Sequence, residues 1–194
     1  GGDTVVIDFG GPTIAKPMHV GQLRSTVIGD SLQRLFRFAG WQVVSDVHLG
    51  DWGKQMGLLI VEIMAQRKHP ALARIGATPE PRTTVDVSTS EQLGLDSLEA
   101  LYPQAAAAAK ADPAFDELAR KATTLLQSGD ADYVGIWKEL VAASIVGLKR
   151  EFASLGVTFD LWNGEANAEP FVPDMVAELK ARGIAVEDQG AWVV

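Results

Sequence analysis

The chain of 194 residues is 47% hydrophobic, which is enough to bury a substantial core and excludes general disorder. Its formal net charge of -8 excludes a broadly basic nucleic-acid-binding surface, so any contact with RNA would need a local basic patch. The absence of cysteine excludes disulfides, thiolate catalysis and cysteine-based zinc sites, and the three histidines lie too far apart for a local metal motif.

The first third of the chain alternates between strand and helix patterns. A short β-branched, apolar run predicts a buried strand, which the segment Gly-Gly-Pro then ends. Apolar residues at helical spacing follow, and Gly40 is placed to end that helix. Strand, helix, strand and helix in succession favour a parallel α/β sheet. In order, the expected elements are a strand at 4–9, a helix to about 38, a strand at 41–47 and a helix at about 54–66.

The middle of the chain changes to a mainly helical pattern. Residues 69–90 hold three prolines and little periodicity, and residues 88–91 have the spacing of a capping box that starts a helix running toward the alanines at 105–109. Asp112 and Pro113 supply an N-cap and a first-turn proline. Two further helices are expected at about 114–126 and 132–155.

The carboxyl-terminal part predicts one more strand, a helix and a hairpin. The strand is expected at 156–160, the helix at 173–182 with Gly183 as its end, and the hairpin turn at 188–190. The last strand of this hairpin is short, and an incomplete strand leaves unpaired edge groups. Together with a start that lacks Met, this pattern predicts a piece of a longer protein.

The junction between the first strand and the first helix holds the densest cluster of reactive residues, at positions 10–26. Such junctions bind ligands in α/β sheets, because a helix amino terminus offers free N–H groups to phosphate and a small residue such as Gly21 allows close approach. Lys16 could add a charge, and His19 and Gln22 could donate hydrogen bonds. By spacing alone, a turn, a helix cap and a solvated lysine explain the same residues equally well.

Residues 14–21, Ile-Ala-Lys-Pro-Met-His-Val-Gly, and the following 23–26, Leu-Arg-Ser-Thr, resemble the arginyl-tRNA synthetase form of the class I HIGH signature. The similarity continues through 28–30, 48–53 and 155–183. The resemblance implies an α/β fold that is the first half of a Rossmann-like parallel nucleotide-binding fold with a helical insertion. It implies that residues 1–165 form the first half of the catalytic domain, with the insertion at about 71–128, and that 166–194 begin a truncated connective insertion.

The resemblance also implies a two-step reaction, in which arginine is activated by ATP to arginyl adenylate and then transferred to tRNA(Arg). Mg²⁺ is expected to accompany ATP, and no protein-bound metal is expected. By this resemblance the catalytic residues are His19, Gln22 and Lys16. The further ATP contacts are expected to be Pro17, Met18, Gly21 and His48, and the arginine contacts are expected to be Asp8, Gly11 and Thr13.

Two positions depart from the family pattern. Gln22 stands where the signature has a second histidine, and a carboxamide can donate a hydrogen bond but carries no charge. This predicts weaker catalysis with nucleotide binding retained. Thr13 stands where asparagine is usual, which predicts altered arginine affinity. For Asp8 a loop-capping role is the alternative, and for residues 50–53 we favour a tight turn with a packed Trp52 over a direct part in the chemistry.

Two functions remain open from the sequence. The first is a truncated fragment of an arginine–tRNA ligase that is inactive alone. The alternative is a freestanding, synthetase-like nucleotide-binding or interaction module without ligase activity. A cytoplasmic location without membrane contact is expected, because no apolar run approaches 18 residues and no signal segment is present. An oligomer could form through the exposed, truncated sheet.

Overall fold

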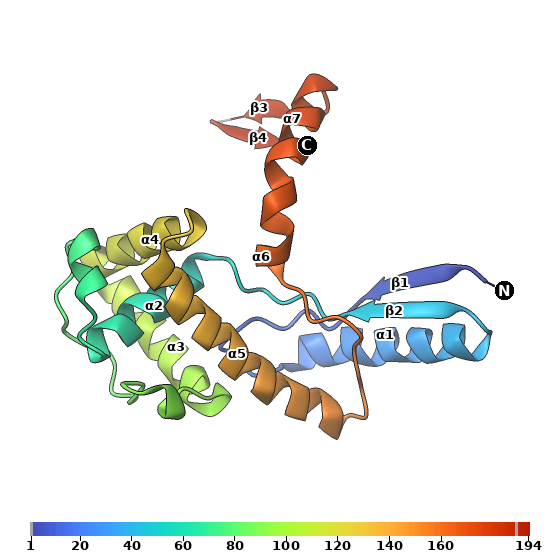
Figure 1. Cartoon of the computed structure of the whole chain (residues 1–194), viewed down its shortest axis with the longest axis horizontal. Coiled ribbons are helices and arrows are strands. Elements are labelled where there is room, and N and C mark those ends of the chain that lie inside the picture. Colours follow the sequence, from blue (N-terminus) through green and yellow to red (C-terminus); the bar gives the residue numbers. More distant parts are fainter. Residues whose placement is uncertain (1, 189) are drawn as a thin grey trace.

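The computed structural model describes residues 2–188 and 190–194, and in it a small parallel sheet, a group of helices and a carboxyl-terminal arm follow one another (Figure 1). The sheet pairs β1 (Thr4–Asp8) with β2 (Gln42–Asp46), and α1 (Val20–Phe38) connects them. The helical group contains α2 (Lys54–Gln66), α3 (Leu95–Ala111), α4 (Pro113–Gln127) and α5 (Ala131–Ser154). The parallel pairing of β1 and β2 and all these helices confirm the expected order of elements.

On the other side of β2, and just after it, the chain forms isolated β-bridges with residues 161–164 and no full strand. Asp46 pairs with Leu161 and Leu49 with Gly164, both in the parallel direction. The strand expected at 156–160 is therefore wrong, because the chain reaches the edge of β2 only at its carboxyl end. Asp160 turns its carboxylate onto Ser45, from which it accepts hydrogen bonds of 2.8 Å from the backbone N–H and 2.9 Å from the hydroxyl. These bonds, with the nearby Arg37 guanidinium, lower the pKa of Asp160.

The strand β1 is less buried than its composition predicts. Its residues alternate between exposed and half-buried, and Val6 is 68% exposed. The apolar face of α1 is exposed as well, while the residues that α1 buries are Thr26, Gly29 and Gln33. Within the described residues β1 has one strand neighbour, so one edge of this small sheet and the outer face of α1 have no packing partner.

The main hydrophobic core lies in the helical group, with α2 at its centre. Every residue of α2 from Met56 to Ala65 is buried, and α2 packs most extensively against α4. Glu62 is fully buried on α2, and its carboxylate accepts the backbone N–H groups of Arg82 and Thr83 and the Thr83 hydroxyl. This carboxylate fixes the irregular segment that leads to α3.

The predicted start of α3 is wrong by several residues. The capping box is formed by Thr89 and Gln92, and it begins only the short 3-10 helix η2 (Ser90–Gln92). Leu93 and Gly94 then adopt extended backbone angles, which stop the helix until Leu95. The predicted start of α4 is confirmed, since the Asp112 carboxylate accepts the N–H of Ala114 at 2.9 Å ahead of Pro113.

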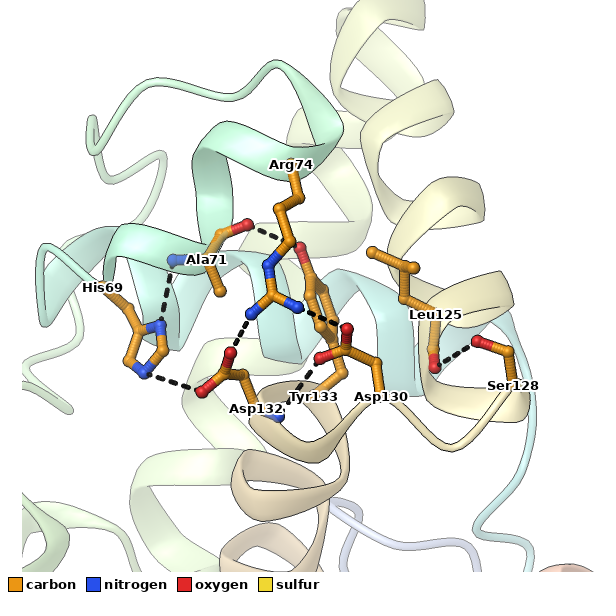
Figure 2. Close-up of polar contacts among 8 residues, drawn as sticks. All are labelled: His69, Ala71, Arg74, Leu125, Ser128, Asp130, Asp132 and Tyr133. Carbon is orange, nitrogen blue, oxygen red and sulfur yellow. Dashed lines mark hydrogen bonds and ion pairs between the residues drawn. The ribbon is translucent and has the colours of Figure 1, made fainter.

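A polar network joins the 3-10 helix η1 (Pro70–Ile75) to the start of α5 (Figure 2). The Arg74 guanidinium contacts the carboxylates of both Asp130 and Asp132. His69 accepts the N–H of Ala71 through Nδ1 at 3.2 Å, while its Nε2 lies 3.9 Å from Asp132. The Tyr133 hydroxyl donates to the Ala71 carbonyl at 3.2 Å, and burial raises the pKa of this tyrosine. The network closes the helical group at the end remote from the sheet.

The carboxyl-terminal arm extends away from both other parts (Figure 1). It consists of α6 (Glu165–Ala168), η3 (Glu169–Phe171), α7 (Val172–Ala181), and the antiparallel pair β3 (Val186–Asp188) and β4 (Ala191–Val193). The predicted helix and hairpin are confirmed, although Gln189 of the predicted turn lies outside the described residues. None of the helices in the described part of the chain is long and apolar enough to cross a membrane.

Candidate functional site

The loop between β1 and α1 crosses the carboxyl edge of the sheet. Ile14 N–H donates to the Gly50 carbonyl at 3.1 Å, and Gly50 N–H donates to the Pro12 carbonyl at 3.0 Å. Thr13 thereby forms a parallel bridge with Gly50, and Gly11 N–H donates to Val47 of the segment after β2. Two candidates for arginine contact, Gly11 and Thr13, are thus both held at this edge. We call residues 14–19 the signature loop.

His19 ends the signature loop as the N-cap of α1. Its Nδ1 accepts the N–H of Gly21 at 3.1 Å, so a neutral His19 carries its proton on Nε2. The side chain is exposed, and Nε2–H is the donor left over by the cap. A Cβ on Gly21 would lie 3.0 Å from the imidazole ring, so a larger residue here would require the exposed ring to shift slightly. The helix-cap role is therefore present, and it leaves a hydrogen-bond donor directed away from the cap.

Gln22 connects the signature loop, the helix and the loop after β1. Its Oε1 accepts the N–H of His19 at 3.1 Å, and its Nε2 donates to the Gly11 carbonyl at 3.0 Å. The amide has two N–H donors, so one remains after the bond to Gly11. Gln22 thus has a structural role that the signature alone did not indicate, together with one donor for a ligand.

The remaining signature residues divide between two places. Lys16 lies with Nζ 4.3 Å from the centre of the Tyr102 ring on α3, a cation–π contact. Met18 and His19 line a cavity of about 350 Å³ beside the end of α5. A larger cavity, of about 710 Å³, has Tyr102 in its wall, but neither Met18 nor His19. The structure therefore does not bring Lys16 and His19 together around one cavity, and Pro17 lies half-buried between them.

Acidic residues and His48 gather at the carboxyl ends of the two strands. The strand register places Asp8 beside Asp46. Asp8 is exposed, and no hydrogen bond or ion pair of its carboxylate is found within residues 2–188 and 190–194, so the alternative of a loop cap is not observed. His48 has a positive φ of 43°, and its Nδ1 lies 3.9 Å from the Asp46 carboxylate. Asp8 and His48 thus belong to the same sheet edge as the signature loop.

The segment 50–53 forms a packed turn, in line with the structural role favoured above. Trp52 packs edge-on against Trp137 of α5, with ring centres 5.4 Å apart, and Trp137 Nε1 donates to the Asp51 carbonyl. The Asp51 side chain is buried and accepts the N–H of Ala166 at 3.0 Å. Burial raises the pKa of Asp51, the Ala166 hydrogen bond opposes the rise, and the nearby Glu165 carboxylate adds to it.

The Asp51→Asn substitution is expected to become relatively more favourable as the pH rises. Because the native pKa of Asp51 is raised, its contribution to stability is complete below the unfolded value of 3.8 and decreases as the pH rises through the native value. Asparagine keeps an acceptor for Ala166 and has no charge to bury. Urea unfolding at about pH 4 and about pH 7.5 tests this. The unfolding free energy of the variant, relative to that of the wild type, should be higher at the upper pH than at the lower pH. A difference that stays constant or falls would contradict the raised pKa of Asp51.

Two contacts of the signature loop were not foreseen from the sequence, and both come from α5. Ser144 Oγ accepts the N–H of Ala15 at 3.1 Å, and Glu151 Oε2 accepts the N–H of Met18 at 3.1 Å. A spacing of seven residues places the two side chains on one face of a helix, but it does not identify what that face contacts. No group of three or more metal-ligating side chains is found among the described residues.

Comparisons with known proteins identify the family of the chain. The family described as "tRNA synthetases class I (R), catalytic domain" matches residues 2–78 and 80–194. Arginine–tRNA ligases of Maricaulis maris and Francisella tularensis subsp. novicida are 49% and 46% identical over 191 and 190 residues, which is 98% of this chain and 32% of each relative. This chain therefore spans about a third of the length of these relatives.

A solved structure shows the same fold. The crystal structure of arginyl-tRNA synthetase from Plasmodium falciparum matches 97% of this chain and 29% of its own chain, with a TM-score of 0.73 and 28% identity. The match to the family model extends over nearly all of the sequence, including the signature loop and the strands that present it. The chain therefore belongs to the family of class I arginyl-tRNA synthetase catalytic domains.

Proposed function

We propose that this chain is the nucleotide-binding part of an arginine–tRNA ligase, which activates arginine with ATP and transfers it to tRNA(Arg). The observation that carries the proposal is the position of His19 and Gln22. Both lie at the amino terminus of α1, at the carboxyl edge of the sheet, and each has an unused donor. The names and the 46–49% identities of the relatives support the same reaction.

In the first step, the arginine carboxylate oxygen attacks the α-phosphorus of ATP, and the bond to the pyrophosphate oxygen breaks. The equatorial oxygens gain charge in the pentavalent transition state. Nε2–H of His19 and the second N–H of Gln22 supply donors for these oxygens, and the positive end of the α1 dipole favours them. The uncharged Gln22 amide stabilises this charge less than an imidazolium would. The reaction is therefore slower than with histidine at position 22, while nucleotide binding is retained.

In the second step, a ribose hydroxyl of the tRNA terminus attacks the arginyl carbonyl, and AMP leaves with the bonding electrons. Arginine is held for both steps by Asp8, whose carboxylate suits bidentate pairing with a guanidinium, and by Gly11 and Thr13 beside it. The further contacts with the nucleotide are made by Pro17, Met18, Gly21 and His48. Lys16 would leave Tyr102 to reach the phosphates. Mg²⁺ is proposed to arrive with ATP as part of the substrate, because Mg²⁺ commonly binds through substrate phosphates.

The proposed domain arrangement follows the same assignment. Residues 1–165 form the first half of a Rossmann-like catalytic domain, the helices within about 71–128 are its insertion, and 166–194 begin a connective insertion. The exposed apolar face of α1 and the free edge of β1 suit contact with further parts of a longer ligase, or with a second copy of this chain. A cytoplasmic enzyme that does not contact membranes is the corresponding proposal for its location. A freestanding module without ligase activity has no comparable support among the relatives.

A chimera tests the proposed function. The matching third of the Maricaulis maris ligase is replaced by this chain, and ATP–pyrophosphate exchange is measured with arginine and tRNA(Arg) present. Exchange that depends on arginine, and is lost when the replaced segment carries His19→Ala, is the expected result. A folded chimera that is no more active than its His19→Ala variant would overturn the proposal.

A further inference from the structure

The signature loop depends on side chains of α5 for its shape. The N–H of Ala15 donates to Ser144 Oγ and the N–H of Met18 donates to Glu151 Oε2, both at 3.1 Å. These partners are 129 and 133 residues away in sequence. The residues on either side are fixed from other elements, since Ile14 N–H donates to Gly50 and His19 N–H donates to Gln22. The N–H groups of the loop thus rely on acceptors outside it.

Ala15 shows why an external contact is needed. Its φ is 63°, in the left-handed region, where a residue with a Cβ is strained. Ala15 and Ser144 are both fully buried, so water cannot satisfy the Ala15 N–H if the serine hydroxyl is removed. The Ser144 hydroxyl therefore stabilises a backbone conformation that the local sequence does not favour.

Glu151 acts closer to the reactive end of the loop. Met18, whose N–H it accepts, directly precedes His19, and Glu151 lines the cavity of about 350 Å³ that Met18 and His19 also line. Ser144 and Glu151 are two helical turns apart on α5, so a rigid helix holds both ends of the segment 15–18 at a fixed spacing. Lys16 lies between the two contacts.

We infer that Ser144 and Glu151 are positioning residues, which fix the backbone of the signature loop so that His19 faces the phosphates of ATP and Lys16 can reach them once it leaves Tyr102. The inference rests on the proposed function for its catalytic consequence, while the contacts themselves are independent of it. Small misplacements of catalytic groups can reduce rates by about a hundredfold, so the loss of either contact should be visible in turnover.

The first experiment measures amide hydrogen exchange by NMR in this chain. Ser144→Ala should speed the exchange of the Ala15 amide by about tenfold, because the buried N–H loses its only partner in the described structure. Glu151→Ala should do the same for Met18, and Glu151→Gln should restore protection, since its amide oxygen still accepts. Thr124→Ala is the control for the loss of a helix hydroxyl, because Thr124 Oγ1 donates to the Arg120 carbonyl within α4 and lies outside the signature loop and its cavity. Unchanged exchange at Ala15 and Met18 would overturn the inference.

The second experiment places the same variants in the chimera. We expect kcat of pyrophosphate exchange to fall about tenfold or more in Ser144→Ala and Glu151→Ala with little change in KM for ATP, and Glu151→Gln to recover activity. Glu139→Ala is the control for a carboxylate of α5 that contacts other elements, here Arg67 and Ser90. Losses of kcat no greater than those of the two control variants would overturn the positioning role but not the proposed function. A chimera that is inactive without any of these substitutions would overturn the proposed function and, with it, their role in catalysis.

Discussion

The Gly57→Ala variant is expected to lose roughly 3 kcal/mol of unfolding free energy, at the upper end of the range for overpacked cores. Gly57 lies on α2 where this helix packs against α4. A Cβ at this position would lie 2.1 Å from the Ala119 carbonyl oxygen and 2.3 Å from Thr123 Oγ1. The first of these atoms is backbone, so the two helices must separate, and their contact is the most extensive between helices in the described chain.

Urea unfolding of Gly57→Ala and Gly135→Ala checks this expectation. Gly135 lies on α5, and a Cβ there would meet no atom within 4 Å. Alanine at 135 should therefore raise stability by about 0.5–1 kcal/mol through its better helix propensity. If Gly57→Ala unfolds at the same urea concentration as the wild type, the close packing of α2 on α4 is wrong.

The His19→Ala variant of the chimera is expected to lose about a hundred- to thousandfold in kcat, the usual effect of removing one donor to a developing oxyanion. In the proposed mechanism the Nε2–H of His19 is that donor, because Nδ1 is engaged with Gly21 N–H. Alanine also removes the N-cap of α1, which should reduce stability by about 1 kcal/mol. The two roles of His19 therefore have to be separated.

His19→Asn separates them. Asparagine is among the strongest N-cap residues, so α1 should keep its stability, yet its short side chain does not reproduce the Nε2 donor. Thermal unfolding near the wild-type midpoint together with the same loss of kcat is the expected outcome. If His19→Asn keeps wild-type turnover, the cap is the only function of His19 and its catalytic role is contradicted.

The elements that position the site could be predicted because their signals are local. The β-branched run of β1, the helical spacing in α1 and the Asp112-Pro113 start of α4 each depend on neighbouring residues, and the structure contains all three. The start of α3 was misplaced for a local reason too. Both Thr89 and Gly94 offer helix starts, and the extended backbone at Leu93 decides between them.

Burial and long-range contacts could not be predicted in this way. The apolar residues of α1 have the spacing of a core-facing helix, but Val27, Ile28 and Leu32 are exposed because no described element packs there. Ser144 and Glu151 contact a loop more than 120 residues away, and a serine or glutamate in a helix has no local pattern that reveals such a partner. The dual use of Gln22 likewise depends on where Gly11 lies in space.

Calorimetric titration of this chain with ATP, with and without arginine, tests the central claim most directly. The Lys16→Ala plus His19→Ala protein serves as the comparison. If the chain holds the nucleotide half of an arginine–tRNA ligase site, the wild type should bind ATP saturably and the double variant should not. Binding that is equal in the two proteins, or saturable binding in neither, would contradict the claim that this segment forms the nucleotide site by itself.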